Sequence, residues 1–254
     1  MSHNDHDNNW IDKLEGKFLV IDGPDRIGKS SLCERIVQEI NEYRHHKRER
    51  QTPGDVRGRA MLIRFPRRKS AIGQVIDKQL KGQVDIVPDA QVLLFLADMT
   101  DAVASIQEVL ASGGTVVSDR YTGSTYAYAM SQNLSMKSSV LYDAISLVPY
   151  PDINIFLLPS TRDTSFIAYR EGFGGEVTET EEIQNKVIGH MEAFCNMRQQ
   201  HLHHQQQHQT SQRKQTNKQD SQKDDDAQRH KNIVLDVRSY DTKDEVFAKF
   251  KQLL

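Results

Sequence analysis

The chain has 254 residues, 37% hydrophobic content and a formal net charge of −2 at pH 7. This allows one sizeable core, and the near-neutral charge gives no electrostatic argument for a nucleic-acid or membrane partner. The first residues contain no secretory signal, no apolar run approaches the roughly 20 residues of a membrane span, and Cys33 and Cys195 fit no metal spacing. We therefore expect a cytoplasmic or nuclear protein with free thiols.

Five short apolar runs alternate along the chain with longer segments of helical periodicity. The runs predict buried strands at Phe18–Asp22, Ala60–Phe65, Gly114–Asp119, Asp152–Leu158 and Asn232–Val237. The periodic segments predict helices at Ser30–Tyr43, Ala71–Leu80, Asp89–Ala111, Met136–Leu147, Thr161–Arg170, Glu181–Gln200 and Thr242–Leu254. This alternation predicts an α/β fold with a five-stranded parallel sheet and helices on both faces.

Two polar segments interrupt this pattern. Residues Arg44–Arg59 are basic and have no apolar face, which predicts a surface loop inserted at 44–59. Residues Gln199–Lys231 are of low complexity and nearly devoid of aliphatic side chains, so too little apolar surface is available to offset the entropy of ordering. We predict a disordered insertion at 199–231. Because a strand and a helix are predicted after it, we expect a single domain over residues 1–254.

The segment GPDRIGKS, residues Gly23–Ser30, fits the P-loop pattern and lies between a predicted strand and a predicted helix. Its glycines let the backbone approach a phosphate, and the helix that follows presents its positive end. Lys29 is expected to reach the terminal phosphates, and the Ser30 hydroxyl is expected to bind Mg²⁺. The alternative is a plain strand-to-helix turn. The predicted ATP-binding residues of this loop are Gly23, Gly28, Lys29, Ser30 and Ser31.

A P-loop leaves three classes of protein open: a GTPase switch, a nucleotide-dependent motor or binding module, and a small-molecule kinase. The guanine-type pattern Asn217–Asp220 lies in the polar tract without a strand before it, which argues against a GTPase. A kinase is favoured because phosphoryl transfer between two anions needs cations around the transferring group. The sequence places four arginines at the carboxyl ends of predicted strands: Arg26, Arg67, Arg68 and Arg120.

From about Lys17 to Phe194, and on into the last strand and helix, the chain resembles the thymidylate kinase family. The blocks that carry the resemblance are "LIRFPRRKSAIG", "QVLLFLAD", "VVSDRYTGSTYAYA", "VPYPDINIFL" and "YREGFGGEVTETEEIQNKV", and Asp-Arg within the P-loop is characteristic of the eukaryotic-type branch. The resemblance implies a P-loop NTPase fold with a lid segment, transfer of the γ-phosphate of ATP to dTMP with Mg²⁺, and a homodimer.

On the donor side, the resemblance implies four catalytic residues. Lys29 and Arg26 serve the phosphates, with Arg26 bridging those of donor and acceptor. Asp119 and Arg120 serve the metal shell and the transferring phosphate, so Ser30 and Asp119 are the expected metal ligands. Arg170 and the segment Gly172–Glu182 resemble the lid over ATP, which excludes water as a competing acceptor.

On the acceptor side, the resemblance implies that the Asp25 carboxylate accepts a hydrogen bond from the 3′-hydroxyl of the sugar. Arg68 binds the 5′-phosphate, and Phe95 stacks on the pyrimidine. The remaining acceptor residues are Phe65 beside the nucleotide, Met99 and Tyr128 near the base, Arg120, and Gln184 just after the lid. From the residues alone, Phe65, Phe95 and Tyr128 could equally be core aromatics.

Three departures from the family pattern fall on the acceptor side. Met99 stands where the family has an arginine that contacts the base, Gly123-Ser124-Thr125 replaces aromatic-Ser-Gly, and Thr178 stands in place of a lid tyrosine. Methionine offers no hydrogen-bond donor, so we predict weaker selection among pyrimidine monophosphates, unless Asp98 or another donor substitutes. A kinase for another pyrimidine monophosphate and a nucleotide-binding protein without turnover are the alternatives.

Overall fold

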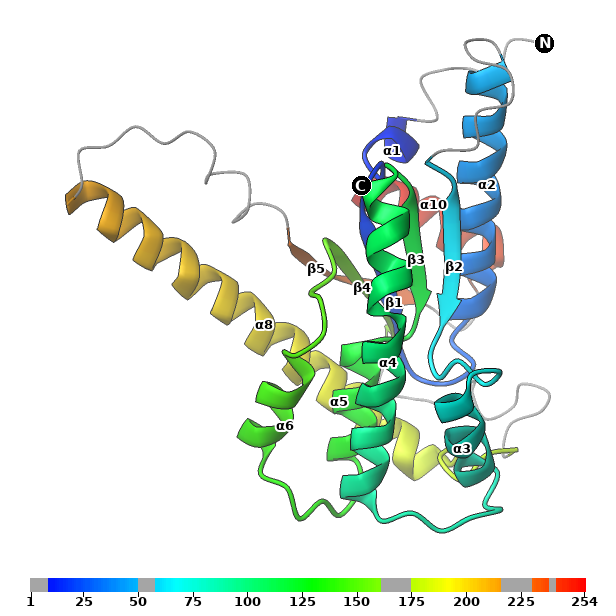
Figure 1. The fold of residues 1–254 in the computed structure, drawn as a ribbon, viewed down its shortest axis with the longest axis vertical. Helices are drawn as coiled ribbons and strands as arrows, with labels where there is room; N and C mark the ends of the chain where they lie inside the picture. The colour runs from blue at the N-terminus through cyan, green and yellow to red at the C-terminus, as the bar shows by residue number, and fades with distance from the viewer. Residues whose placement is uncertain (1–8, 50–57, 161–174, 216–229, 238–240) are drawn as a thin grey trace.

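The computed structural model describes residues 9–49, 58–160, 175–215, 230–237 and 241–254. A five-stranded parallel sheet runs through the middle of the molecule (Figure 1), in the order β2-β3-β1-β4-β5. The predicted α/β fold is therefore confirmed, with each predicted strand found to within one or two residues. The strands are β1 (Phe18–Asp22), β2 (Ala60–Arg64), β3 (Thr115–Asp119), β4 (Ile153–Pro159) and β5 (Lys231–Val237).

Helices cover both faces of this sheet, as expected where strands read as continuous apolar runs. β1, β3 and β4 are buried throughout. The helices are α1 (Asn9–Asp12), α2 (Lys29–Glu49), α3 (Ala71–Leu80), α4 (Pro88–Ala111), α5 (Thr122–Met130), α6 (Ser138–Ile145), α8 (Glu181–Gln215) and α10 (Lys243–Leu253).

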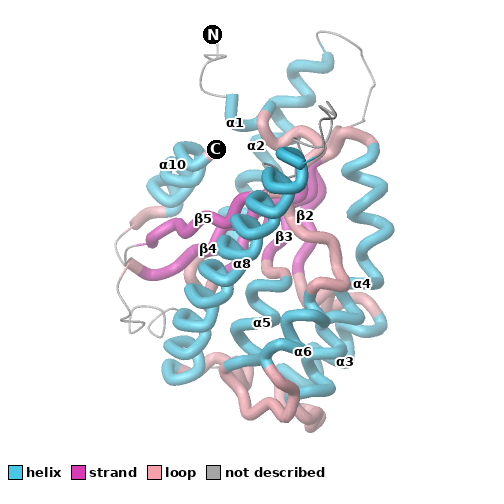
Figure 2. The backbone as a smooth tube through the Cα atoms, turned by 90° about the vertical axis from the view of Figure 1, so that its left-hand side faces the viewer, coloured by secondary structure: helices cyan, strands magenta, loops and turns pink. Residues whose placement is uncertain are grey.

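The alternation of side chains along β4 divides the core into two layers. Ile155 and Leu157 pack with the side chains of α1, α2 and α10. Phe156 and Leu158 point the other way and pack with α4, α5, α6 and α8. Figure 2 shows α8 passing along β4 and β5 on one face of the sheet, with α10 on the opposite face. The sheet is thus held rigidly from both sides, and its carboxyl edge carries the loops.

Helix α2 extends farther than the sequence suggested. It runs to Glu49 instead of ending near Tyr43, and Arg44 is buried, so the predicted surface loop is wrong for residues 44–49. The guanidinium of Arg44 donates to the Gly58 carbonyl at 2.5 Å and to Thr115 Oγ1 at 2.9 Å. Burial of the cation is tolerated because these acceptors satisfy it. Residues 50–57 of the predicted loop lie outside the described part of the chain.

The polar tract also differs from expectation in its first half. α8 continues past Gln200 through Gln215, so residues 199–215, predicted to be disordered, belong to this helix. At the far end of the tract, Lys231 belongs to β5, so the prediction of disorder is wrong there as well. Residues 216–229 and the predicted helix Thr161–Arg170 lie outside the described residues. None of the described helices combines the length and apolar character that a membrane span needs.

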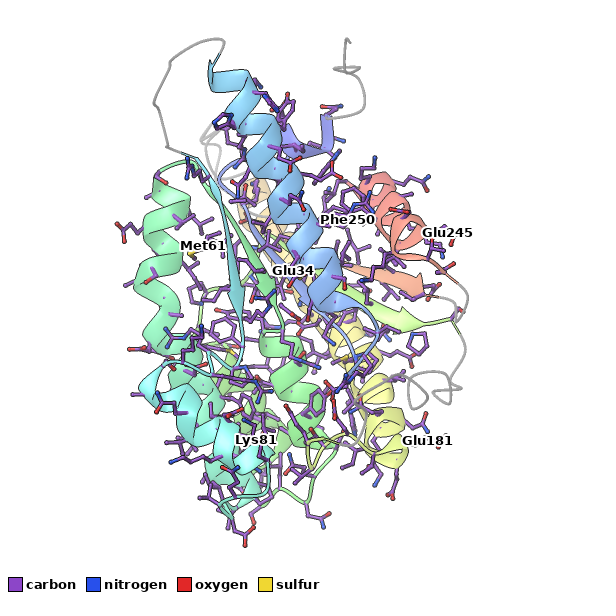
Figure 3. The ribbon with its side chains drawn as sticks, turned by 90° about the vertical axis from the view of Figure 1, so that its right-hand side faces the viewer. Glu34, Met61, Lys81, Glu181, Glu245 and Phe250 are labelled. Carbon is purple, nitrogen blue, oxygen red and sulfur yellow. The ribbon has the colours of Figure 1, made fainter. Side chains whose placement is uncertain are left out.

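Two helices were absent from the prediction. α1 was missed because the residues before it are polar, yet Trp10 is buried edge-on against Phe247 and Phe250, with ring centroids 5.7 and 5.6 Å away. Figure 3 shows Phe250 on the side of α10 that faces α2. The second missed helix, α5, directly follows β3 and forms part of the candidate site.

Candidate active site

The site lies where β1, β2 and β3 end. The strand register places Ile21 of β1 and Arg64 of β2 on either side of Asp119 of β3, so the segments after these strands meet at one edge of the sheet. A cleft of about 970 Å³ opens there. Most of the predicted site residues line it: Asp25, Arg26, Gly28, Lys29, Ser30, Ser31, Phe65, Arg68, Phe95, Met99, Asp119, Arg120 and Tyr128.

Two predicted site residues lie behind the cleft wall, and one lies outside the described chain. Gly23 packs against β4, where a Cβ atom would come within 2.6 Å of the Leu157 carbonyl oxygen, so only glycine fits. Gln184 is fully buried and reaches the cleft through Asp25. Arg170 belongs to the residues that the structure does not describe. Its role therefore stays a prediction.

The backbone of the P-loop curls back on itself. Gly28 has φ of +107° and Arg26 has φ of +62°, both in the region that glycine favours. The Lys29 ammonium donates to the Pro24 carbonyl at 2.5 Å, within the concave side of the loop. Burial, together with the charge of Arg120, lowers the pKa of Lys29 to about 8, although nearby carboxylates oppose this. A phosphate bound here would restore the preference for the protonated form.

The corner formed by Ser30 and Asp119 fits a magnesium ion. Ser30 Oγ donates to Asp119 Oδ2 at 2.6 Å, and the other carboxylate oxygen, Oδ1, is buried without a hydrogen-bond partner. A buried unpaired carboxylate oxygen is costly, and Mg²⁺ takes one or two such oxygens together with phosphates and water. The donor set is therefore suited to the predicted metal.

Asp25, within the P-loop, is held by side chains from three other elements. Its carboxylate accepts from Arg120, from the Tyr128 hydroxyl at 2.6 Å and from Gln184 Nε2 at 2.8 Å. Its backbone N–H donates to Gln184 Oε1 at 2.7 Å. Burial alone would raise the pKa of Asp25, but Arg120, Lys29 and the two side-chain donors lower it below the ordinary value. The group is therefore ionised and acts as an acceptor.

Arg120 lies between the P-loop and Tyr128 of α5. Its guanidinium pairs with Asp25 and donates to the Gly23 carbonyl at 3.0 Å, and it lies 5.2 Å from the ring centre of Tyr128. Burial opposes the positive charge, but Tyr128 and the carboxylates around it, beginning with Asp25, raise the pKa of Arg120. A fixed cation therefore lies between the P-loop and the wall assigned to the acceptor.

The wall assigned to the base is apolar. Phe65 and Met99 are buried at the edge of the core, and Phe95 is half-buried on α4 one turn before Met99. Asp98, suggested as a substitute donor, does not fill that role. It is fully buried, and it accepts from the backbone N–H of Arg67 at 2.7 Å, from Arg67 Nε at 3.0 Å and from Ser70 Oγ at 2.9 Å.

Two acids of the predicted lid segment contact site arginines, a feature that the sequence did not reveal. Glu176 Oε1 accepts from Arg68 Nη2 at 2.5 Å, and Glu179 Oε1 accepts from Arg26 Nε at 3.1 Å. The segment is tied to α3 by a hydrogen bond from Val177 N to Leu80 O. These pairs join residues more than 100 positions apart, which no local pattern could have indicated.

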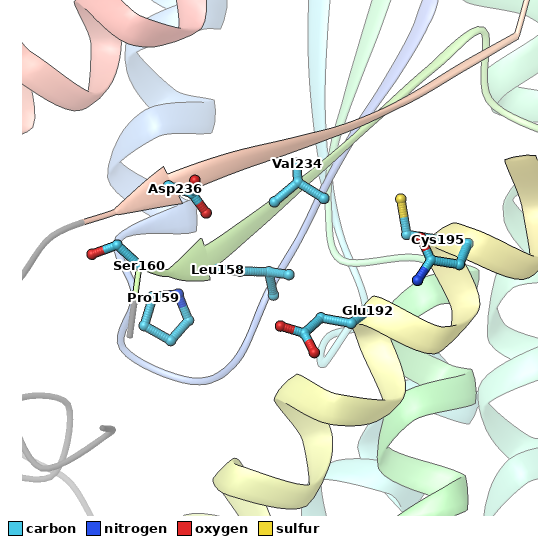
Figure 4. Close-up of a pocket in the computed structure, with 8 residues that line it drawn as sticks. Leu158, Pro159, Ser160, Glu192, Cys195, Val234 and Asp236 are labelled. Atoms are coloured by element: carbon cyan, nitrogen blue, oxygen red, sulfur yellow. The ribbon is translucent and has the colours of Figure 1, made fainter. Parts of the chain in front are cut away.

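A second cavity lies away from these residues. It has a volume of about 430 Å³ and lies between α8 and the ends of β4 and β5, lined in part by Leu158, Glu192, Cys195, Val234 and Asp236 (Figure 4). Burial raises the pKa of the Cys195 thiol to about 11, so this cysteine is not an activated nucleophile. None of the predicted site residues that the structure describes lines this cavity, and the candidate site is the larger cleft.

Comparison with known proteins bears directly on this cleft. The sequence model of the family described as "Thymidylate kinase" matches residues 21–215. The chain is 35% identical over 180 residues to the thymidylate kinase of Caenorhabditis elegans, covering 71% of this chain and 78% of the relative. It is 30% identical over 174 residues to that of Homo sapiens, covering 68% and 74%.

A solved thymidylate kinase structure from Candida albicans covers 94% of this chain and 91% of its own, with a TM-score of 0.61 and 23% identity, which shows a shared fold. The fold is thus the P-loop NTPase fold expected from the sequence. The family match spans most of the chain and contains the P-loop, the base wall and the Asp119-Arg120 pair. The chain belongs to the thymidylate kinase family.

Proposed function

We propose that this nucleoside monophosphate kinase transfers the γ-phosphate of Mg²⁺-bound ATP to dTMP, giving dTDP for dTTP biosynthesis. The observation that carries the proposal is the place of Arg120, which contacts the P-loop at Gly23 and Asp25 and lies 5.2 Å from the ring centre of Tyr128 on the acceptor side. A cation between two anionic substrates offsets the charge that would otherwise keep them apart.

The donor half of the proposal rests on the P-loop. Lys29 would leave the Pro24 carbonyl and bind the terminal phosphates of ATP, while Gly28, Ser31 and the start of α2 present backbone N–H groups. Ser30 and Asp119 would hold Mg²⁺, which neutralises charge on the phosphates. Arg26 would leave Glu179 and stabilise the transferring group. Direct in-line transfer needs no covalent intermediate.

The acceptor half rests on the opposite wall. Phe95 would stack on the pyrimidine and Arg68 would bind the 5′-phosphate with a bidentate fork. The ionised Asp25 would accept a hydrogen bond from the 3′-hydroxyl of the sugar. Tyr128 and Gln184 keep this carboxylate in place, so their contribution to the acceptor goes through Asp25.

Selectivity for the base is expected to be looser than in a site with a donor at position 99. Met99 fills apolar space without offering a hydrogen bond, and both oxygens of Asp98 are engaged with Arg67 and Ser70. A kinase for another pyrimidine monophosphate is therefore the alternative to be tested. A homodimer and a cytoplasmic or nuclear location remain further predictions.

The test is a coupled assay of ADP release with ATP and a panel of monophosphates: dTMP, dUMP, dCMP and purine counterparts. The proposal predicts the highest kcat/KM with dTMP and measurable turnover with the other pyrimidines. Turnover confined to dCMP or to a purine would contradict the proposed acceptor. Binding of ATP without turnover on any monophosphate would indicate a nucleotide-binding protein without catalysis.

A further inference from the structure

Asp22, the last residue of β1, is fully buried directly before the P-loop. One of its oxygens, Oδ1, accepts three hydrogen bonds from the start of α5. The donors are the backbone N–H groups of Tyr121 and Ser124, at 3.0 and 2.9 Å, and the Ser124 hydroxyl at 2.6 Å. The other oxygen, Oδ2, is buried and has no hydrogen-bond partner among the described residues, so Oδ1 carries the contacts that fix the strand and the helix relative to each other.

Helix α5 has no cap of its own. Its N-cap residue, Tyr121, makes no side-chain cap hydrogen bond, and the first N–H groups of a helix need acceptors from elsewhere. Asp22, at the end of β1, supplies such an acceptor for Ser124 N, although the two residues are 102 positions apart in the sequence. The position of Asp22 therefore determines where α5 begins.

The residue just before this helix start is Arg120, and its backbone is strained. Its φ is +70°, which a non-glycine residue retains only where its surroundings hold it. Arg120 N donates to the Ile21 carbonyl at 3.0 Å, and Ser118 Oγ donates to the Arg120 carbonyl at 2.7 Å. With the hydrogen bond from Tyr121 N to Asp22, the peptide groups on both sides of Arg120 are anchored.

The same carboxylate also acts on the Arg120 side chain. Ser124 Oγ donates to Asp22 Oδ1 and accepts from Arg120 Nη1 at 3.3 Å, so the hydroxyl links the two charged groups. The guanidinium lies against the Gly23 carbonyl and Asp25 in the cleft, while Asp22 itself is not among the residues that line the cleft.

Asp22 and Phe156 leave no room for a side chain at the neighbouring Gly123. A Cβ atom at position 123 would lie 2.5 Å from Asp22 Oδ2 and 2.8 Å from the ring of Phe156. Because any side chain here would displace the carboxylate, the glycine preserves the contact between β1 and α5. The chain thus carries a closely fitted connection between the P-loop strand and Arg120.

We propose that Asp22 is a positioning residue for phosphoryl transfer, holding Arg120 in place through Ser124 and the Tyr121 N–H without touching substrate. The inference rests on the proposed function, in which Arg120 meets the transferring phosphate. Removing the Asp22 carboxylate, whose Oδ1 accepts these hydrogen bonds, should therefore slow the chemical step more than it weakens the binding of either substrate.

The experiment compares Asp22→Ala, Asp22→Asn and the control Asp152→Ala. Asp152 also accepts from a backbone N–H of β1, that of Phe18 at 2.8 Å, but at the end of the strand away from the cleft. The monophosphate substrate in these assays is the one that the wild-type protein phosphorylates fastest. The role of Asp22 is then tested even if dTMP proves not to be the substrate. Kinetics are measured at a temperature where each variant is folded.

The proposal predicts that Asp22→Ala lowers kcat on the order of 10²-fold while both KM values stay within about threefold. Asp22→Asn, which keeps an oxygen acceptor, should return kcat to within about tenfold of wild type, and Asp152→Ala should leave kcat unchanged. If Asp22→Ala does not fold, Ser124→Ala, which removes only the hydroxyl link, should lower kcat about tenfold with KM retained. A folded Asp22→Ala or Ser124→Ala with wild-type kcat, or an Asp22→Asn as slow as the alanine variant, would overturn the proposal.

Discussion

Arg68 and Glu176, 108 residues apart in the sequence, form an ion pair across the mouth of the cleft, with 2.5 Å between Nη2 and Oε1. Arg68 also pairs with Asp77 of α3, which in turn pairs with Lys81. A phosphate that binds Arg68 must replace at least one of these carboxylates. Among the described residues, Asp77 has a second cation, Lys81, whereas Glu176 pairs with Arg68 alone. Glu176 is therefore expected to leave, which couples acceptor binding to movement of the lid segment.

Glu176→Gln should therefore strengthen binding of the acceptor. Both partners are partly exposed, so the effect is modest, a fall in the KM for dTMP of about two- to fivefold with little change in kcat. Steady-state kinetics with varied dTMP measure it. Glu108→Gln, a change to an exposed acid of α4 that does not line the cleft, is the matched control and should leave the KM unaltered. An unchanged or increased KM in Glu176→Gln would show that the pair does not compete with the acceptor.

The KM for ATP should rise with pH across the pKa of Lys29. This pKa is lowered to about 8, so the protein without ATP loses the lysine charge as the pH passes from about 7 to about 9. Bound phosphates favour the protonated form, so kcat at saturating ATP should change less. Measuring kcat and KM over this range checks the prediction. A KM for ATP that stays flat would mean that Lys29 does not meet the phosphates.

Arg26→Ala should lower kcat more than it raises either KM. Arg26 is expected to stabilise charge that develops during transfer, and loss of one such donor typically costs about 10²–10³-fold in rate. Arg35→Ala is the control, because Arg35 pairs with Glu39 of α2 and Asp244 of α10 and does not line the cleft. Equal kcat in Arg26→Ala and wild type would place Arg26 outside the transfer step.

Met99→Arg should sharpen the preference for dTMP over dCMP and dUMP. An arginine on this wall could donate to the carbonyl oxygens along the thymine edge, and hydrogen bonds discriminate more strongly than shape. The measurement is kcat/KM for each acceptor. Thr100→Arg, at an exposed neighbouring position of α4, is the control. A wild-type protein already strongly selective for dTMP, with no gain from Met99→Arg, would contradict the role given to Met99.

The strands and the P-loop could be predicted because their signals are contiguous in the sequence. Phe18–Asp22 reads as a buried strand, and the spacing of Gly23, Gly28 and Lys29 carries its own chemistry. By contrast, α5 has no local cap signal, because the acceptor for its first turn is Asp22 on another strand. Arg44 was assigned to a loop for the same kind of reason, since its acceptors at Gly58 and Thr115 are distant in sequence.

In the candidate site, too, local motifs could be predicted from the sequence, whereas contacts between distant segments could not. The type of each cleft residue could be inferred from the motif that contains it, and the structure brings most of these residues to one edge of the sheet. The pairing of Arg26 with Glu179 and of Arg68 with Glu176 depends on where the fold places the residues just before α8 relative to the cleft. Such contacts between distant segments follow from tertiary packing, which hydrophobic periodicity does not encode.

Formation of dTDP from Mg²⁺-ATP and dTMP, followed by chromatography in wild type and in Lys29→Ala, tests this cleft as the site of transfer. Wild type should form dTDP and ADP in equal amounts. Lys29→Ala should give at most a trace of either product, with a circular dichroism spectrum and melting curve like those of wild type, because among the described residues Lys29 donates a hydrogen bond to Pro24 of its own loop and to no other element. Near-normal dTDP formation by Lys29→Ala, or none by wild type, would contradict the assignment of this cleft as the site of transfer.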